Sequence, residues 1–370
     1  MKDNYILTAE SVTAGHPDKL CDTIADNVLD ACLKEDPNAR VACEVLATAG
    51  KILVAGELRT TASPDVEAIV RQVVRNAGYD CNYHVEVRLH TQSPDIAGAV
   101  DGDTLGAGDQ GIMYGYACWE TVELLPAPVV LANRITSLLT TCREENLISG
   151  MGPDGKAQVS VQYAFGVPER VDTIVISCQH DADKDPDELR EELRRLVIAR
   201  ACHDVRIDEQ TKILINPSGR FVLGGFEADT GLTGRKLMVD TYGGLAHHGG
   251  GALSGKDPTK VDRSGAYMAR YIAKNVVHCG LAKECEVSIS YAIGKAAPVS
   301  FTVDTFGTGK YPDEAIRKAC LEAFNVRPAA IIEKLCLRNP GFEETATYGH
   351  FTGLRTWENT MNIKEMIRFE

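Results

Sequence analysis

The sequence contains three versions of one segment: SPDVEAIVRQVVRNAG from Ser63, DPDELREELRRLVIARAC from Asp185 and YPDEAIRKACLEAF from Tyr311. Each opens on a Pro-Asp pair and continues with apolar residues at helical spacing. Proline suits the first turn of a helix because its missing N–H is not needed there, and acids in that turn complement the helix dipole. Successive prolines of these pairs are 122 and 126 residues apart. The spacing therefore predicts an internal repeat the length of one domain.

The surroundings of the three segments repeat as well. Two alternating apolar and polar runs, typical of paired strands, precede each Pro-Asp helix; they are VACEVLAT and KILVAGELRT, AQVSVQYAFG and DTIVISCQH, and CEVSISYAIG and PVSFTVDTFG. A longer helical pattern precedes each pair, over residues 18–35, 127–145 and 262–280. Strands joined as hairpins form antiparallel or mixed sheets. We therefore expect an α+β fold of three similar domains, in which mixed β-sheets covered by helices are related by a pseudo-threefold repeat, over residues 1–100, 101–225 and 226–370.

Composition and charge narrow the classes of function. The chain has 370 residues, 44% hydrophobic and 25% charged, as in a folded globular protein rather than a disordered one. Its net charge of −13 argues against binding to nucleic acid or to an anionic membrane. No apolar run approaches the length of a membrane span, and the N-terminus lacks the features of a secretory signal. The twelve cysteines form no C-x-x-C motif, so we expect free thiols in a reducing, cytoplasmic compartment.

The densest group of glycines, 11 of 33, lies between Gly219 and Gly255. Glycine lets the backbone approach a ligand closely, and successive free N–H groups form cradles for anions, although tight turns between strands would also use glycine. Over residues 234–274 seven basic residues and three acids give +4 in a chain of −13. A basic island in an acidic chain favours a pocket for a small anion. The residues interleaved with the glycines predict a polyphosphate site: Arg235, Lys236, His247, His248, Lys256 and Lys260.

One part of this stretch nearly matches the phosphate-binding P-loop. Residues 250–256, GGALSGK, fit G-x-x-x-x-G-K. The Ser or Thr that should follow is Asp257, and Pro258 disfavours a helical conformation at that residue. A P-loop also needs a strand directly before it, whereas HHGGG stands here. The sequence therefore argues against a true P-loop.

Two acids stand at helix starts and match the needs of a metal ion. Asp18 follows His16 and Pro17 at the start of one predicted helix, and Asp262 opens another directly after the basic island. Mg²⁺ uses one or two carboxylates together with waters and phosphate oxygens, so these acids are its candidate ligands. Asp22, Asp26 and Asp30 follow at four-residue spacing, and we interpret them as a solvated helix face.

Two further segments look like loops. Residues 92–109 contain few large apolar side chains and are typical of a mobile loop or lid. At its end, Asp109-Gln110 is either a ligand contact or a polar turn. Residues 152–156, GPDGK, are typical of a hairpin turn before a strand.

Together these residues resemble the S-adenosylmethionine synthase (methionine adenosyltransferase) family. The resemblance spans nearly the whole chain, and the motifs that carry it are GHPDKLCD at Gly15, GAGDQGIMYGYA at Gly106, PDGKAQV at Pro153, INPSGRFVLGG at Ile215, DTGLTGRKLMVDTYGGLAHHGGGALSGKDPTKVDRSGAYMARYIAKN at Asp229 and the C-terminal ETATYGHF. It implies three similar domains. It also implies a displacement in which the sulfur of L-methionine attacks C5′ of ATP, followed by hydrolysis of the released triphosphate to diphosphate and phosphate.

The resemblance also implies roles for single residues. The catalytic ones are His16, Lys156, Asp109 and Lys256. The contacts to ATP are His16, Asp154, Gly155, Lys156, Arg220, Phe221, Asp229, Arg235, Lys236, Ala252 and Lys256. Methionine is expected at Glu57, Gln92, Asp229 and Lys260. Mg²⁺, with two ions per site, is expected at Asp18 and Asp262, and K⁺ at Glu44.

Members of the family form homodimers or homotetramers with active sites at the dimer interface, and residues 92–109 correspond to their gate. This sequence differs from the family pattern at Gly152, Ala228 and Leu253, and both the gate and residues 78–90 are shorter. None of these differences removes a chemical group named above. Two other functions remain open: a kinase or ATPase that uses residues 250–256, and a catalytically silent nucleotide-binding subunit.

Overall fold

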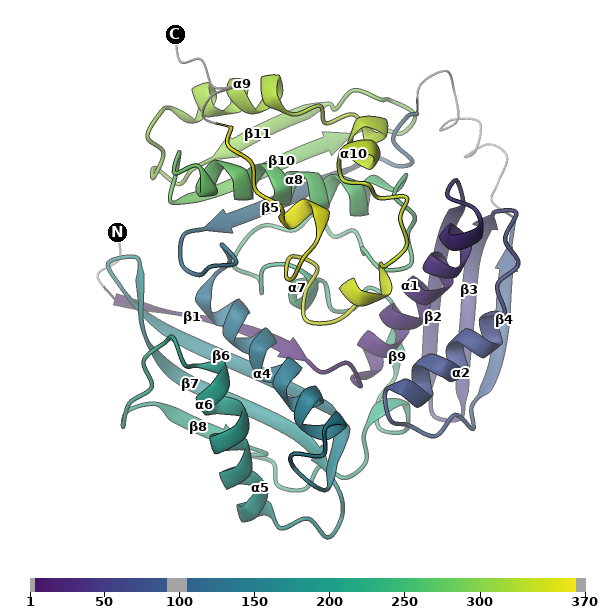
Figure 1. Ribbon diagram of the computed structural model, residues 1–370, viewed down its shortest axis with the longest axis vertical. Coiled ribbons are helices and arrows are strands. Elements are labelled where there is room, and N and C mark those ends of the chain that lie inside the picture. The colour runs from purple at the N-terminus through teal and green to yellow at the C-terminus, as the bar shows by residue number, and fades with distance from the viewer. Residues whose placement is uncertain (1–3, 92–104, 364–370) are drawn as a thin grey trace.

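The computed structural model describes residues 4–91 and 105–363, which form three β-sheets with helices packed against them (Figure 1). The first sheet has the order β4-β3-β2-β9, with bounds His84–His90, Lys51–Arg59, Arg40–Thr48 and Gly231–Leu232. The second is β1-β6-β7-β8, with bounds Asn4–Val12, Met151–Ala164, Val167–His180 and Lys212–Ile215. The third is β11-β10-β5, with bounds Ser300–Asp304, Glu284–Tyr291 and Gly111–Cys118. The α+β class predicted from the sequence is confirmed.

Each sheet has a long helix followed in the chain by a hairpin and then by a shorter helix. The long helices are α1 (Pro17–Glu35), α4 (Ala127–Glu144) and α8 (Val261–His278). The shorter ones are α2 (Val66–Asn76), α5 (Pro186–Leu193), which continues through a π-turn (Arg194–Ile198) into α6 (Ala199–Ala201), and α9 (Asp313–Ala323). Helices α7 (Leu237–Asp240) and α10 (Pro328–Lys334) and 3₁₀ turns at Gly225–Glu227, Glu343–Thr345 and Thr356–Glu358 lie outside this pattern. The repeat of long helix, hairpin and short helix agrees with the sequence prediction.

Each repeat, together with the strand that precedes its long helix, forms a unit, and the three units exchange these strands in a cyclic order. Strand β1 precedes α1 in the chain but pairs with β6 of the second sheet. In the same way β5 precedes α4 and pairs with β10 of the third sheet, and β9 precedes α8 and pairs with β2 of the first. Each unit therefore completes the sheet of another, which fixes the starts of the three long helices relative to one another.

The Pro-Asp segments form helices, but their prolines are not equivalent. Pro186 lies at the first helical position of α5, as predicted. Helix α2 starts only at Val66, because the Asp65 carboxylate caps it by accepting the Ala68 N–H at 3.0 Å, which leaves Pro64 outside. Pro312 is the N-cap of α9. The prediction that every one of these prolines occupies the first turn is therefore wrong for two of the three.

The GPDGK segment is not a hairpin turn. It belongs to β6, where the pairing with β7 shifts in register between Met151 and Gly155. The bulge lets the Pro153 carbonyl accept a hydrogen bond from the Thr13 hydroxyl at 2.8 Å. Residues 153–156 are therefore joined to the segment that enters α1.

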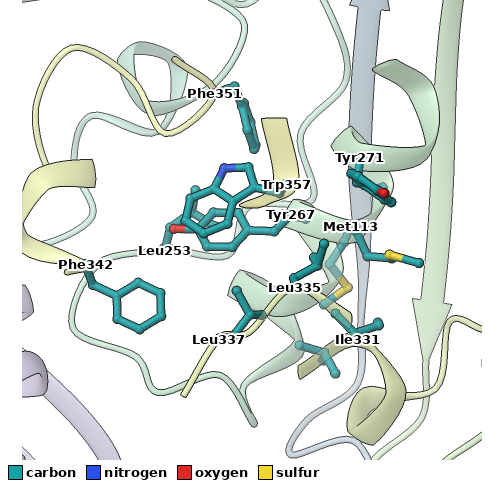
Figure 2. Packing of buried hydrophobic residues seen from close by; sticks show 14 of the residues in the cluster. Met113, Leu253, Tyr267, Tyr271, Ile331, Leu335, Leu337, Phe342, Phe351 and Trp357 are labelled. Carbon is teal, nitrogen blue, oxygen red and sulfur yellow. The ribbon is translucent and has the colours of Figure 1, made fainter. Parts of the chain in front are cut away.

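The largest core extends from α1, α2 and the first sheet to the third sheet, α8 and the C-terminal segment, and Figure 2 shows part of it. The rings of Tyr267 and Trp357 stack with centroids 3.9 Å apart, and the Arg263 guanidinium lies 4.3 Å from the Phe342 ring centroid. All twelve cysteines are free thiols, and ten are buried, as expected for small apolar side chains. Among the described residues, no helix is both long and apolar enough to cross a membrane.

Candidate active site

The N-terminus of α1 brings together several residues predicted to contact ATP. His16 is the N-cap, and its Nδ1 accepts the Asp18 N–H at 3.2 Å. Burial and the positive charges of Lys236 and Lys156 lower the pKa of His16 to about 3, so the ring is neutral at pH 7. Because Nδ1 accepts a hydrogen bond, the proton of the neutral ring is on Nε2. His16 is therefore a hydrogen-bond donor through Nε2.

Asp18 joins this N-terminus to the glycine-rich segment. Its Oδ2 accepts the Lys236 ammonium at 2.7 Å, and its Oδ1 accepts the Leu232 N–H at 3.0 Å, with the Arg235 guanidinium 3.6 Å away. Burial alone would raise the pKa of Asp18, but the hydrogen bonds from Lys236 and the Leu232 N–H outweigh it and hold the pKa below its usual range. The carboxylate is therefore ionised and faces two cations. We refer to His16, Asp18, Lys156, Arg235 and Lys236 as the α1 group.

Asp154 lies beside the α1 group and is buried. Its Oδ2 accepts the Gly225 N–H at 2.9 Å, whereas its Oδ1 has no partner, and burial raises the pKa of this carboxyl. The Tyr79 hydroxyl donates to the Gly15 carbonyl at 2.9 Å and its ring packs on Gly225. Tyr79, which the sequence reasoning missed, therefore connects the entry to α1 with the segment that holds Asp154.

The start of α8 carries a second group. The Lys256 ammonium donates to Asp262 Oδ2 at 2.6 Å, and Asp262 is the second residue of α8. A Cβ at Gly251 would overlap the Asp262 side chain, so only glycine lets the backbone approach this acid so closely. Burial raises the pKa of Glu44 on β2, and the nearby charge of Lys256 opposes that rise. We refer to Glu44, Lys256, Lys260 and Asp262 as the α8 group.

Lys260 of this group forms an ion pair with Asp257, whose Oδ2 also accepts the Val41 N–H at 2.8 Å. Burial opposes ionisation of Asp257, but Lys260 and the hydrogen bonds lower its pKa. No strand directly precedes residues 250–256. The residue that replaces the P-loop Ser or Thr is thus a buried structural acid, which agrees with the argument against a P-loop.

The remaining predicted site residues differ in burial, and some lie outside the described chain. Asp109, Arg220 and Asp229 are exposed, and Phe221 and Ala252 are partly buried. Glu57 on β3 is 42% exposed, with its Oε1 3.4 Å from His90 Nε2. Gly155 is buried in β6. Gln92 and most of the predicted gate lie outside the described residues.

Asp18 and Asp262, the predicted magnesium ligands, lie in different groups of one chain. Asp18 bonds Lys236, and Asp262 bonds Lys256. Among the described residues no cluster of three or more acids, histidines or cysteines is arranged to hold a metal ion. A joint magnesium site of Asp18 and Asp262 stays a prediction.

The prediction of a solvated face for Asp22, Asp26 and Asp30 is wrong. All three are buried, at 0%, 0% and 2% exposure. Their carboxylates accept backbone N–H groups of distant segments: Gly234 at 2.9 Å for Asp22, Gly255 at 2.8 Å for Asp26, and residues 341–343 for Asp30. Acids at four-residue spacing share one helix face, but the spacing alone does not reveal what covers that face.

Known proteins of one family match this chain over nearly its whole length. Residues 4–102, 104–221 and 223–359 match the N-terminal, central and C-terminal domains of S-adenosylmethionine synthetase. The chain belongs to the S-adenosylmethionine synthetase family. Its curated relatives named S-adenosylmethionine synthase include those of Finegoldia magna (50% identity over 94% of both chains), Desulfosudis oleivorans (49%, over 99% of this chain and 98% of the relative) and Treponema denticola (50%, over 96% of both).

The three matches clarify the exchange of strands in this S-adenosylmethionine synthetase family member. Strand β1 lies in the N-terminal match but completes the sheet of the central one, and β9 lies in the C-terminal match but completes the first sheet. The α1 group likewise combines residues of all three matches: Asp18, Lys156 and Lys236. The α1 group of this chain is therefore built between the three matched domains.

Proposed function

We propose that this protein is a methionine adenosyltransferase, which converts ATP, L-methionine and water into S-adenosylmethionine, phosphate and diphosphate. The observation that carries the proposal is the family match over the whole chain, with lysine–carboxylate pairs at the starts of both α1 and α8. Such pairs supply cations for a triphosphate and carboxylates for a cation or a developing sulfonium.

In the proposed reaction the methionine sulfur donates an electron pair to C5′ of ATP, and the C5′–O bond breaks. The triphosphate leaves with that bonding pair, and water then hydrolyses it. Neutral His16 donates its Nε2 proton in a hydrogen bond to a triphosphate oxygen, while Lys156, Lys236 and Lys256 neutralise the leaving group. Asp109 lies near the sulfonium. Because both substrates are held in line, the step becomes effectively unimolecular.

The proposed reaction also requires two kinds of metal cation, Mg²⁺ and K⁺. Asp18 and Asp262 each have a carboxylate oxygen that bonds an ammonium, so each accepts a cation in this fold, and carboxylate oxygens suit Mg²⁺. Bound there with the triphosphate, Mg²⁺ would stabilise the negative charge of the leaving group. Glu44, an exposed carboxylate on β2, is the proposed K⁺ ligand.

We assign the complete site to a homodimer or a homotetramer. Asp18 accepts a hydrogen bond from the Leu232 N–H, whereas Asp26 accepts one from the Gly255 N–H. These two acids are eight residues apart, which is about 12 Å along α1. Lys256 of the α8 group directly follows Gly255 and is therefore well separated from the α1 group along this helix. An interface that places the α8 group of one protomer against the α1 group of its partner would unite them. We further propose a cytoplasmic enzyme, as its free thiols favour, which binds neither nucleic acid nor an anionic membrane, as its −13 charge favours.

A product assay with ATP, L-methionine, Mg²⁺ and K⁺, run with and without methionine, tests the reaction. We expect S-adenosylmethionine together with diphosphate and phosphate, and only when methionine is present. ADP formed without methionine would replace the proposal with a kinase or ATPase. Binding of ATP without any turnover would identify a silent nucleotide-binding subunit.

The methionine subsite is tested at Glu57, which lies on β3. We expect Glu57→Gln to raise the KM for methionine roughly tenfold, because a charge-assisted contact to the substrate ammonium is lost. The KM for ATP should stay unchanged. Glu86→Gln is the matched control, since Glu86 is an acid on the neighbouring strand β4 that pairs with Lys51 instead. An unchanged response to methionine in Glu57→Gln would remove Glu57 from the site.

A further inference from the structure

Helix α1 presents a row of four carboxylates at every fourth position, and each holds backbone N–H groups of a segment distant in sequence. Asp18 accepts a hydrogen bond from the Leu232 N–H, Asp22 from the Gly234 N–H, and Asp26 from the Gly255 N–H. The last acid, Asp30, holds the N–H groups of Gly341, Phe342 and Glu343 at 2.9–3.1 Å. The first three acids thus fix the glycine-rich segment, and the fourth fixes the C-terminal segment.

Asp22 differs from its neighbours in the way its charge is balanced. Its Oδ2 accepts the fully buried Lys19 ammonium at 2.9 Å, and Lys19 also forms an ion pair with Asp240 of α7. Its Oδ1 accepts the Gly234 N–H, directly before Arg235 and Lys236. Asp22 therefore binds the segment that carries two cations of the α1 group, from a position that solvent does not reach.

Asp18 cannot hold that segment by itself once a polyphosphate binds. Lys236 bonds the Asp18 carboxylate at 2.7 Å, so phosphate oxygens and a metal ion compete for both partners of the pair. The Asp22 carboxylate is fully buried and accepts a backbone N–H rather than a phosphate-binding cation, so its bond to Gly234 does not take part in this exchange. A bond that persists on binding keeps the lysine backbone in place and lowers the ordering cost of binding.

We propose that Asp22 is a positioning residue for the triphosphate: it holds Gly234 so that Arg235 and Lys236 are preorganised for the anion, while Asp18 is left to exchange its partners. This inference rests on the proposed function and adds a specific residue to it. The Lys19 ammonium on the same helix pairs with Asp22 and also with Asp240, so Asp22 has its polar partners within the protein interior.

The test compares Asp22→Ala with Asp30→Ala. Both acids lie on α1 and are buried, and both accept backbone N–H groups, but Asp30 holds residues 341–343 rather than the cationic segment. We expect Asp22→Ala to raise the KM for ATP and the Kd for inorganic tripolyphosphate roughly tenfold. Asp30→Ala should lose stability but leave both constants unchanged. Asp22→Asn keeps an oxygen for Gly234 and should restore part of the binding.

Equal effects of Asp22→Ala and Asp30→Ala on tripolyphosphate binding, or no effect of either, would overturn the inference, because Asp22 would then be merely structural. If Asp22→Ala does not fold, Asp22→Asn carries the comparison, since Lys19 keeps its partner Asp240; it must then bind tripolyphosphate more weakly than Asp30→Ala. The titration needs no turnover. A parent chain that binds tripolyphosphate but makes no S-adenosylmethionine would therefore refute the proposed function and leave the role of Asp22 measurable.

Discussion

Helices α1 and α4 occupy the same place in two copies of the repeat, yet they bury different chemistry. The buried face of α1 carries Asp22, Asp26 and Asp30, whereas α4 buries mostly apolar side chains with Thr136 among them. Counted from the first residue of each helix, Thr136 corresponds to Asp26. Its hydroxyl bonds the Ser11 hydroxyl at 2.9 Å, within a packed helix–sheet contact.

The difference follows from what covers each helix. Helix α4 lies against β1 and β6, whose N–H groups are paired within their own sheet. Helix α1 is partly covered by irregular glycine-rich backbone, whose N–H groups have no ladder to join. Buried N–H groups need acceptors, and buried carboxylates need donors, so the two satisfy each other. The repeat gives α1 and α4 the same place in their units, and the glycine-rich segment that covers α1 explains why its buried face carries carboxylates.

Helix α8 extends the comparison to the third copy. Its second residue is Asp262, as the second residue of α1 is Asp18, while that position in α4 is Pro128. Both acids bond lysines of the glycine-rich segment. Two of the three copies therefore have a lysine–carboxylate ion pair at the N-terminus of the long helix.

The largest loss of activity is expected from breaking the Lys256–Asp262 ion pair at the start of α8. Lys256→Ala or Asp262→Ala should lower the rate of S-adenosylmethionine formation roughly 10²–10³-fold. The first removes a cation that neutralises the leaving group, and the second removes a proposed ligand of the Mg²⁺ that would do the same. The fold should persist, since the pair is partly exposed. Asp204→Ala is the control: it breaks a 2.8 Å pair with Arg134 of α4, which lies outside the site. Near-normal rates in both α8 variants would show that their assigned roles are wrong.

A second prediction compares α1 and α4 through stability. Asp26 accepts two bonds from the buried Arg263 guanidinium, at 2.7 and 2.8 Å. Asp26→Asn should lower the free energy of unfolding by about 3–5 kcal/mol, because it leaves a buried cation without its charge partner. Thr136→Val should cost only about 1 kcal/mol, the usual worth of one neutral hydrogen bond. Urea unfolding at fixed protein concentration measures both. Equal losses would mean that the acids of α1 contribute no more than ordinary polar contacts.

The sequence predicted regular elements well, because hydrophobic periodicity is local. The long helix predicted over residues 127–145 is found at Ala127–Glu144, and the run VACEVLAT lies within β2. The family resemblance, rather than any local pattern, grouped His16, Lys156 and Lys236 as contacts to ATP, and the structure brings these residues together near the α1 N-terminus. What the sequence patterns missed is long-range: Asp22 and Gly234 are 212 residues apart, and no local pattern indicates that they touch.

The exchange of strands was missed for the same reason. Strand β9 has two residues, and its pairing with Leu46 and Ala47 depends on the fold rather than on its composition. Tyr79 likewise shows no periodic signal, although it reaches the Gly15 carbonyl from the loop after α2. Contacts of this kind arise from where the repeat places its copies, and only the assembled structure reveals them.

The smallest effect is expected from pH and concerns His350, which is buried beside the charges of α1. Burial, together with Arg263 and Lys19, lowers the pKa of His350 well below its ordinary 6.5. As pH falls below 6.5 the unfolded chain takes up a proton that the folded chain does not, so stability is full above that pH and is lost below it. One such group costs about 1.4 kcal/mol per pH unit, or roughly 2 kcal/mol between pH 6.5 and pH 5.

We therefore expect His350→Gln to flatten the dependence of unfolding free energy on pH between 7 and 5, even if it lowers stability at pH 7. Urea unfolding at both pH values measures this difference. His203→Gln is the control, because His203 is exposed after α6 and its removal should leave the dependence unchanged. A His350→Gln variant with the same pH dependence as the parent would show that the loss at low pH comes from other groups. The acids of α1 would then be the next to examine, because protonation of Asp18 in the folded state would release Lys236.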